Sequence, residues 1–254
     1  MYLEHWNLNH LPFENVPNPS FFYPSPTHEE AMDRLKYAVQ YGKGAAMITG
    51  GVGCGKTILS RALIKILEKE RYHVAAMTNP LLAPVAFLHS VMCSFIESYG
   101  DAPPKAKLWN ELEDRLRTNM ERGKGSVLII DEAQAISDKR TLEELRMLLN
   151  LQTDDKFMLT LLLLGQLELE HLVEGAEPLQ QRIAIKYRLN PLSLPDVGAY
   201  VGHRLRIAGS KKSPFSDEAL ETIHACTQGV PRDINNLCDR SLLAGYLENI
   251  ERVD

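Results

Sequence analysis

The segment from Gly50 to Thr57, with the sequence GGVGCGKT, constrains the fold of this chain more than any other segment. It matches the pattern GxxxxGK[ST], in which glycine backbone N–H groups surround phosphate oxygens and a lysine supplies a positive charge. The apolar run at 45–49 predicts a buried strand before the loop, and apolar residues at helical spacing predict a helix over 58–69. This order places phosphates at a helix N-terminus, so the predicted ligand is a nucleoside triphosphate.

We expect the loop and the residue after it to bind the nucleotide. The predicted binding residues are Gly50, Gly51, Val52, Gly53, Cys54, Gly55, Lys56, Thr57 and Ile58. The ammonium group of Lys56 suits phosphate charge, and the hydroxyl of Thr57 can complete the coordination of Mg²⁺. ATP and Mg²⁺ are therefore the predicted cofactors.

Strands and helices alternate along most of the sequence. Besides the elements around the loop, strands are predicted at 72–77, 127–130, 157–164 and 183–189, and helices at 28–41, 85–99, 107–122 and 141–151. The helix at 28–41 has Thr27 as its expected N-cap and Glu30 as the partner in a capping box. The alternation predicts an α/β fold, a three-layer αβα domain with a mostly parallel sheet.

Both ends of the sequence differ from this pattern. The first 26 residues are rich in proline and aromatic residues, which predicts an extended arm packed on the body. After Pro195 only helices are predicted, at 196–208, 216–227 and 231–247. We therefore predict two domains, an α/β nucleotide-binding core with its arm over 1–192 and a small helical lid over 193–254.

Composition narrows the class of protein further. The 254 residues are 44% hydrophobic and 24% charged, which is typical of globular proteins. The net charge of −5 argues against coating by nucleic acid through bulk charge. The four cysteines are scattered, and the sequence contains neither a signal-peptide pattern nor an apolar run of about 18 residues. We expect a cytoplasmic protein without a membrane segment, with the inner face of the membrane, reached through a partner, as the alternative location.

Acidic and amide residues follow two of the predicted strands. Asp131 and Glu132 come directly after the strand at 127–130, where an open α/β sheet places its ligand residues. The carboxylate of Asp131 can hold Mg²⁺, and Glu132 can polarise a water molecule toward the γ-phosphate as a general base. Gln166 follows the strand at 157–164 and can orient the same water molecule, the role called sensor 1. Glu132 and Gln166 are therefore candidate catalytic residues.

Three arginines are candidates for contacts with the phosphates. Arg182 precedes the last predicted strand, where it can reach the γ-phosphate of a neighbouring subunit and stabilise charge in the transition state. Arg188 is the competing candidate for this role. Arg232 begins a helix of the predicted lid and can contact the phosphates within its own chain as a sensor 2 residue.

Together these residues resemble the AAA+ ATPases, and most closely the ExeA/GspA type associated with bacterial secretion systems. The resemblance covers nearly the full length and includes the loop, DEAQ at 131–134, GQ at 165–166, QRI at 181–183, HRL at 203–205 and GVPR at 229–232. It implies a sheet in the order 5-1-4-3-2, a helical lid, ATP bound between core and lid, and a homo-oligomeric ring or filament. Catalysis would then be completed between subunits.

Two biological processes fit this resemblance. Full-length proteins of the ExeA type continue into a membrane-spanning helix and a peptidoglycan-binding domain, whereas this sequence ends after the predicted lid. The same module resembles transposition regulators of the TnsC and MuB kind, which bind double-stranded DNA as filaments. Basic residues cluster at 115–124 and 204–212 without interleaved aromatics, so double-stranded DNA is the less favoured partner. A protein of a secretion or envelope system is the favoured one, and Glu132 argues against a switch that does not hydrolyse ATP.

Overall fold

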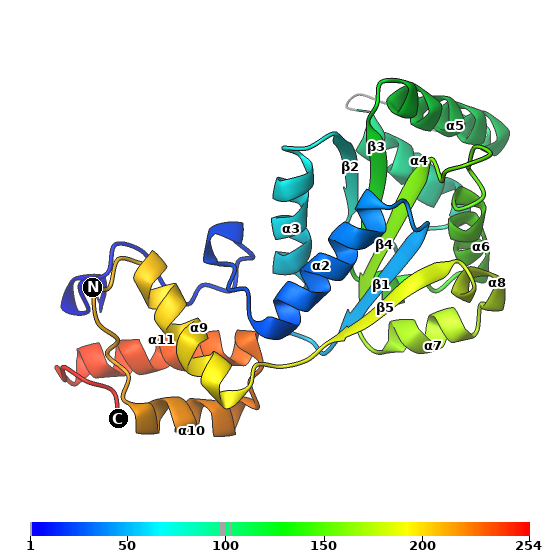
Figure 1. Cartoon of the computed structure of the whole chain (residues 1–254). Helices are drawn as coiled ribbons and strands as arrows, with labels where there is room; N and C mark the ends of the chain where they lie inside the picture. The colour runs from blue at the N-terminus through cyan, green and yellow to red at the C-terminus, as the bar shows by residue number, and fades with distance from the viewer. Residues whose placement is uncertain (1, 97–99, 102) are drawn as a thin grey trace. The chain divides into compact units, whose positions relative to one another are not determined.

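The computed structural model describes residues 2–96, 100–101 and 103–254, which form two compact units. The helical unit comprises Met1–Glu29, Gly51–Arg61 and Leu189–Asp254, and the sheet unit comprises Glu30–Gly50 and Ala62–Arg188. By residue, helix α3 (Lys56–Leu67) belongs to the helical unit up to Arg61 and to the sheet unit from Ala62 on. Figure 1 shows the order of the elements along the chain by colour. The predicted domain boundary after residue 192 stays a prediction.

The sheet unit is built on a five-stranded sheet in the order β2-β3-β4-β1-β5, which confirms the predicted order. Its strands are β1 (Ala45–Gly50), β2 (Tyr72–Met77), β3 (Gly125–Ile130), β4 (Leu159–Gly165) and β5 (Ile183–Leu189). The pairs β1/β4, β2/β3 and β3/β4 are parallel, with Ile48 opposite Leu164 and Ile130 opposite Leu163. The carboxyl ends of β1, β3 and β4 therefore share one edge of the sheet.

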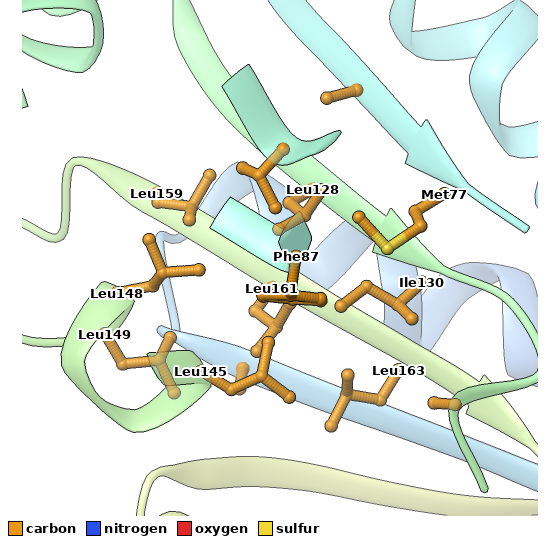
Figure 2. Close-up of a cluster of buried hydrophobic side chains, with 14 of the residues drawn as sticks. Met77, Phe87, Leu128, Ile130, Leu145, Leu148, Leu149, Leu159, Leu161 and Leu163 are labelled. Atoms are coloured by element: carbon orange, nitrogen blue, oxygen red, sulfur yellow. The ribbon is translucent and has the colours of Figure 1, made fainter. Parts of the chain in front are cut away.

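Every residue of β1 and β4 is buried, which explains why both strands read as continuous apolar runs. On one face, alternate residues such as Leu128 and Leu161 pack among Phe87, Leu145 and other apolar side chains (Figure 2). This face is covered by α4 (Pro84–Phe95), α5 (Lys105–Glu121) and α6 (Lys139–Leu148). On the other face lie α2 (Pro26–Gln40) and α3, through their parts within the sheet unit. The three predicted layers are present.

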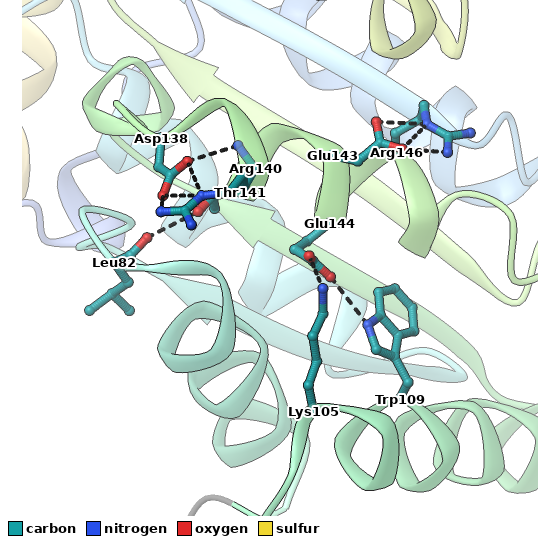
Figure 3. Close-up of polar contacts among 9 residues, drawn as sticks. All are labelled: Leu82, Lys105, Trp109, Asp138, Arg140, Thr141, Glu143, Glu144 and Arg146. Carbon is teal, nitrogen blue, oxygen red and sulfur yellow. Dashed lines mark hydrogen bonds and ion pairs between the residues drawn. The ribbon is translucent and has the colours of Figure 1, made fainter.

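Polar contacts fix α6 against its neighbours (Figure 3). The carboxylate of Glu144 is only 3% exposed and accepts hydrogen bonds from Lys105 Nζ and from Trp109 Nε1, the latter at 3.2 Å. Thr141 Oγ1 donates to the carbonyl of Leu82 at 3.1 Å. Pairing is required because an unpaired carboxylate is costly to bury. These contacts hold α6, which comes after Asp131 and Glu132 in the chain.

The helical unit contains α9 (Leu194–Ile207), α10 (Asp217–Thr227) and α11 (Pro231–Leu247), which confirms a helical C-terminal region. The N-terminal arm contributes to their shared core. Trp6 Nε1 donates to the carbonyl of Leu242 at 2.8 Å, and the buried Arg204 donates from Nε to the carbonyl of Pro12 at 2.6 Å. The arm also contains two short helical segments that the sequence did not predict, α1 (Tyr2–His5) and η1 (Pro19–Phe21).

Some predicted boundaries were wrong. Helix α2 begins at Pro26, so Thr27 lies inside it, and Ser25 Oγ accepts a long 3.5 Å hydrogen bond from the backbone N–H of His28. Glu30 accepts a hydrogen bond from Arg34 at 3.0 Å instead of forming a capping box, and Pro26 occupies the first helical position, which suits proline. The end of the helix predicted at 85–99 lies outside the described residues. Helices α7 (Glu168–Glu174) and α8 (Glu177–Gln180) were missed because they are too short to show periodicity.

Candidate functional site

The loop between β1 and α3 has a backbone that only glycine fits at two positions. Gly53 has φ +80° and Gly55 has φ +97°. A Cβ atom on Gly53 would lie 2.8 Å from the Cβ of Arg232, and one on Gly55 would lie 2.7 Å from Nε2 of His28. Conformation and close packing therefore both exclude side chains here. This is the cradle that backbone recognition of phosphate requires, directly before the N-terminus of the twelve-residue helix α3.

Several carbonyl groups of the loop are already hydrogen-bonded. Lys56 Nζ donates to the carbonyl of Gly51 at 2.9 Å, and the backbone N–H of Arg232 donates to the carbonyl of Gly53 at 3.3 Å. His28 Nε2 is bonded to the carbonyl of Cys54 at 3.0 Å. The predicted residue Arg232 thus contacts the loop through a hydrogen bond from its backbone N–H. Thr57 and Ile58 lie in the first turn of α3.

Glu132 has a strained backbone at the carboxyl end of β3. Its φ of 54° and ψ of 36° lie in the left-handed region, which costs a residue other than glycine about 1–3 kcal/mol. The neighbouring Asp131 is 5% exposed, and its Oδ1 accepts from the backbone N–H of Glu132 at 3.0 Å. A conformation of this cost persists only where the surrounding contacts outweigh it. It supports the choice of Glu132 as a functional residue.

The side chain of Glu132 is held by two glutamines. Gln166 Nε2, following β4, donates to Glu132 Oε2 at 3.3 Å, so the structure brings these two predicted residues together. Gln134 Nε2 donates to the same oxygen at 2.5 Å, and Gln134 Oε1 accepts from the backbone N–H of Gln166 at 3.0 Å. Because a backbone N–H can only donate, the orientation of the Gln134 amide is determined.

Gln134 is a residue of the site that the sequence motifs did not single out as catalytic. Its place in the DEAQ sequence was visible, but its contact with Gln166 spans 32 positions and could not be derived from spacing. The glycine before Gln166 makes room for it, because a Cβ atom on Gly165 would lie 2.7 Å from Gln134 Oε1. Gln134 thus connects the ends of β3 and β4.

The two competing arginines have different partners within the sheet unit. Arg188 forms an ion pair with Glu170, with Nε 3.2 Å from Oε1, and Thr49 Oγ1 donates to the same carboxylate at 2.5 Å. Hydrogen bonds from Arg188 and Thr49 hold the pKa of the Glu170 carboxyl below its ordinary value. Arg182 is half-buried, and its Nη1 makes a long 3.4 Å hydrogen bond to the carbonyl of Leu149. Arg188 is the more firmly engaged of the two.

The fold and these residues define a P-loop nucleotide-binding protein, and a family comparison identifies its class. Residues 39–173 match the model of the AAA domain family, so the chain belongs to this family. It is therefore an ATP-hydrolysing P-loop enzyme.

A curated relative indicates the type of AAA protein. The chain is 38% identical over 255 residues to the general secretion pathway protein A of Aeromonas hydrophila, covering 100% of this chain and 46% of that protein. This supports the resemblance to the ExeA/GspA type. The chain thus spans about half the length of that relative.

Solved structures confirm the fold. The ORC2 protein of Aeropyrum pernix has a TM-score of 0.71 at 17% identity, covering 97% of this chain and 69% of that one. Domain III of the replication initiation protein DnaA from Thermotoga maritima has a TM-score of 0.62 at 19% identity, covering 96% and 94%. At these identities the likeness extends to the fold alone. Among the described residues of this chain, no helix is both long and apolar enough to cross a membrane.

Proposed function

We propose that this protein is a Mg²⁺-dependent ATPase that assembles with copies of itself and couples ATP hydrolysis to the assembly of a secretion or envelope machine. The observation that carries the proposal is the environment of Glu132: its backbone is strained, and two glutamine side chains donate hydrogen bonds to its carboxylate. A residue that only closed a surface turn would not need this support. The relative named for secretion supports the choice of process.

The residues present fit ATP and Mg²⁺. In this proposal the loop binds the phosphates through its backbone N–H groups, and Lys56 and Arg232 contribute positive charge. Thr57 and Asp131 supply hard oxygen ligands of the kind that Mg²⁺ takes from proteins, where it keeps several water molecules. When bound, Mg²⁺ neutralises charge that develops on the phosphates. Glu132 accepts the proton of the attacking water, and Gln166 orients that water.

We propose that Arg182 completes this site from a neighbouring copy of the chain. Its single long hydrogen bond to a carbonyl is more easily given up than the ion pair of Arg188 with Glu170. A guanidinium group placed against a γ-phosphate by a second subunit stabilises the transition state. Hydrolysis would then depend on assembly, which is the property a timing ATPase needs.

The replacement Glu132→Gln tests the hydrolytic role. We expect ATP affinity to stay within about threefold and kcat to fall by about 10²- to 10⁴-fold, because the amide cannot accept a proton from water. Glu143→Gln is the matched control, since Glu143 is an exposed residue of α6 paired with Arg146. Affinity would be measured by calorimetry and turnover by phosphate release. Turnover equal to that of the unmodified protein would remove Glu132 as the base.

The alternative function is a DNA-binding regulator of transposition of the TnsC/MuB kind. One of the two basic clusters is smaller than the sequence suggested, because Arg204 is buried and bonded to carbonyls of the arm. In the other cluster, Arg117 is paired with Glu113 at 2.7 Å. Turnover and particle images with and without double-stranded DNA, at 50 and 200 mM salt, separate the two functions. If the protein forms DNA-dependent filaments that weaken steeply with salt, the DNA-binding function is favoured over the secretion function.

A further inference from the structure

His28 is a buried histidine that the nucleotide-binding motifs do not include. It lies in the first turn of α2 and is 4% exposed. Its two ring nitrogens are both bonded, Nε2 to the carbonyl of Cys54 at 3.0 Å and Nδ1 to the hydroxyl of Ser25 at 2.7 Å. All three residues belong to the helical unit. The arm is thus connected to the middle of the phosphate loop through one imidazole ring.

The partners of the ring determine its protonation. A carbonyl oxygen can only accept, so Nε2 must carry a proton to bond Cys54. Burial lowers the pKa of His28 below its ordinary value, which favours the neutral ring. In the neutral ring, Nδ1 has a lone pair and accepts from the Ser25 hydroxyl. The fully buried hydroxyl of Ser25 then acts as the donor in the 2.7 Å bond to Nδ1, and this bond favours the tautomer that the loop requires.

The bond to Cys54 fixes one peptide plane of the loop. The peptide between Cys54 and Gly55 is trans, so its C=O and its N–H point in opposite directions. A donor that fixes the direction of the Cys54 carbonyl therefore also fixes the direction of the Gly55 N–H, which points to the opposite side of the peptide. Gly55 has φ +97°, a conformation that glycine can leave at little cost. Without an external hold this peptide could rotate and present its oxygen in place of its N–H.

We propose that His28 is a positioning residue that orients the Gly55 N–H for phosphate binding, with Ser25 selecting its tautomer. This inference rests on the proposal that the loop binds the phosphates. His28 does not touch the nucleotide in this scheme and acts through the Cys54–Gly55 peptide. The contact of Gly55 with the ring, where a Cβ atom would lie 2.7 Å from Nε2, shows that the ring packs directly against this peptide.

Two isosteric variants separate positioning from packing. In His28→Gln the side-chain amide N–H reaches the place of Nε2, whereas in His28→Asn it reaches only the place of Nδ1. We expect ADP affinity, measured by calorimetry, to fall about tenfold in His28→Asn, the usual effect of one buried hydrogen bond. In His28→Gln the affinity should stay within about threefold of the unmodified protein. Thermal unfolding of both variants shows how far each has lost stability.

The unmodified protein provides a test that needs no substitution. Nitrogen-15 NMR of the His28 ring should show the neutral tautomer with the proton on Nε2. A proton on Nδ1, equal ADP affinity in all three proteins, or equal losses in both variants would each overturn the inference. If the unmodified protein does not bind ADP at all, the proposed function fails instead. The two failures are therefore distinguishable.

Discussion

The phosphate loop of the helical unit and the acidic edge of the sheet unit use opposite means to present polar groups. In the loop, the groups in question belong to the backbone, glycines occur at positive φ, and side chains such as His28 hold carbonyls from outside. At the edge, the groups are the side chains of Glu132 and Gln166, and Glu132 itself takes the positive φ.

The difference follows from what each region must do. Binding phosphate through N–H groups requires peptide planes with fixed orientation, which side chains at Gly53 and Gly55 would obstruct. Moving a proton requires a carboxylate in a fixed position, so strain in its backbone is tolerated. Changes in the loop should therefore reduce affinity, and changes at the edge should reduce turnover at unchanged affinity.

The largest expected effect concerns Arg182, which we propose reaches the acidic edge of a neighbouring copy of the chain. Arg182→Ala should lower turnover by about 10³-fold or more, the usual contribution of an arginine finger in trans. Mixing this variant with the binding-deficient Lys56→Ala should restore part of the activity, because some interfaces then contain an intact arginine and an intact loop. Arg188→Ala is the control and should change turnover little. No recovery at any mixing ratio would contradict a finger in trans.

A second prediction addresses the loop. Gly53→Ala should weaken ADP binding by about 100-fold, because the new Cβ would lie 2.8 Å from the Cβ of Arg232. Gly123→Ala is a matched control, since Gly123 has a similar φ of +70° but has nothing within 4 Å of the position of its Cβ. Both variants bear about 1–2 kcal/mol of conformational strain, so the control accounts for this strain and leaves the effect of packing within the loop. Equal ADP affinities in the two, measured by calorimetry, would show that close packing of the loop does not matter.

A third prediction addresses the edge. Gln134→Glu keeps an acceptor for the backbone N–H of Gln166 but places an oxygen against Glu132 Oε2 in place of the N–H donor. The two carboxylates repel each other, so we expect kcat to fall about 10- to 100-fold with ADP affinity unchanged. Gln152→Glu, at an exposed position, is the control for the added charge. A loss of affinity in place of turnover would break the distinction between loop and edge.

The smallest expected effect is on pH dependence. Because burial lowers the pKa of His28 in the folded state, the unfolded chain binds a proton below about pH 6.5 that the folded chain does not. Stability is therefore highest above this pH and falls as the pH decreases toward the folded pKa, by at most about 1.4 kcal/mol per pH unit for one proton. His28→Gln should reduce this slope between pH 7.5 and 5.5 in urea unfolding. The pKa values of His73 and His203 are also lowered by burial, so these two residues maintain part of the dependence of stability on pH in the His28→Gln variant. An unchanged slope would show that His28 does not contribute.

The sequence by itself determined the fold class and the bounds of β2, β5 and α11, whereas the strand order was implied by the resemblance to the AAA+ ATPases. Such features depend on local signals, because apolar runs, helical periodicity and a first-turn proline are all readable within a few residues. The same holds for the loop pattern and for the acidic pair after β3. The resemblance to the AAA+ ATPases of the ExeA/GspA type was also carried by short motifs.

Only the tertiary structure decided which groups hold these motifs in place. Gln134 reaches Gln166 across 32 positions, His28 reaches Cys54 across 26, and Arg204 reaches Pro12 across 192. Such pairs depend on how strands and helices pack, and a single sequence has no local signal for them. Arg188 is the clearest case, since its sequence position allowed a role in trans but the packing of β5 against α7 gave it Glu170 as a partner.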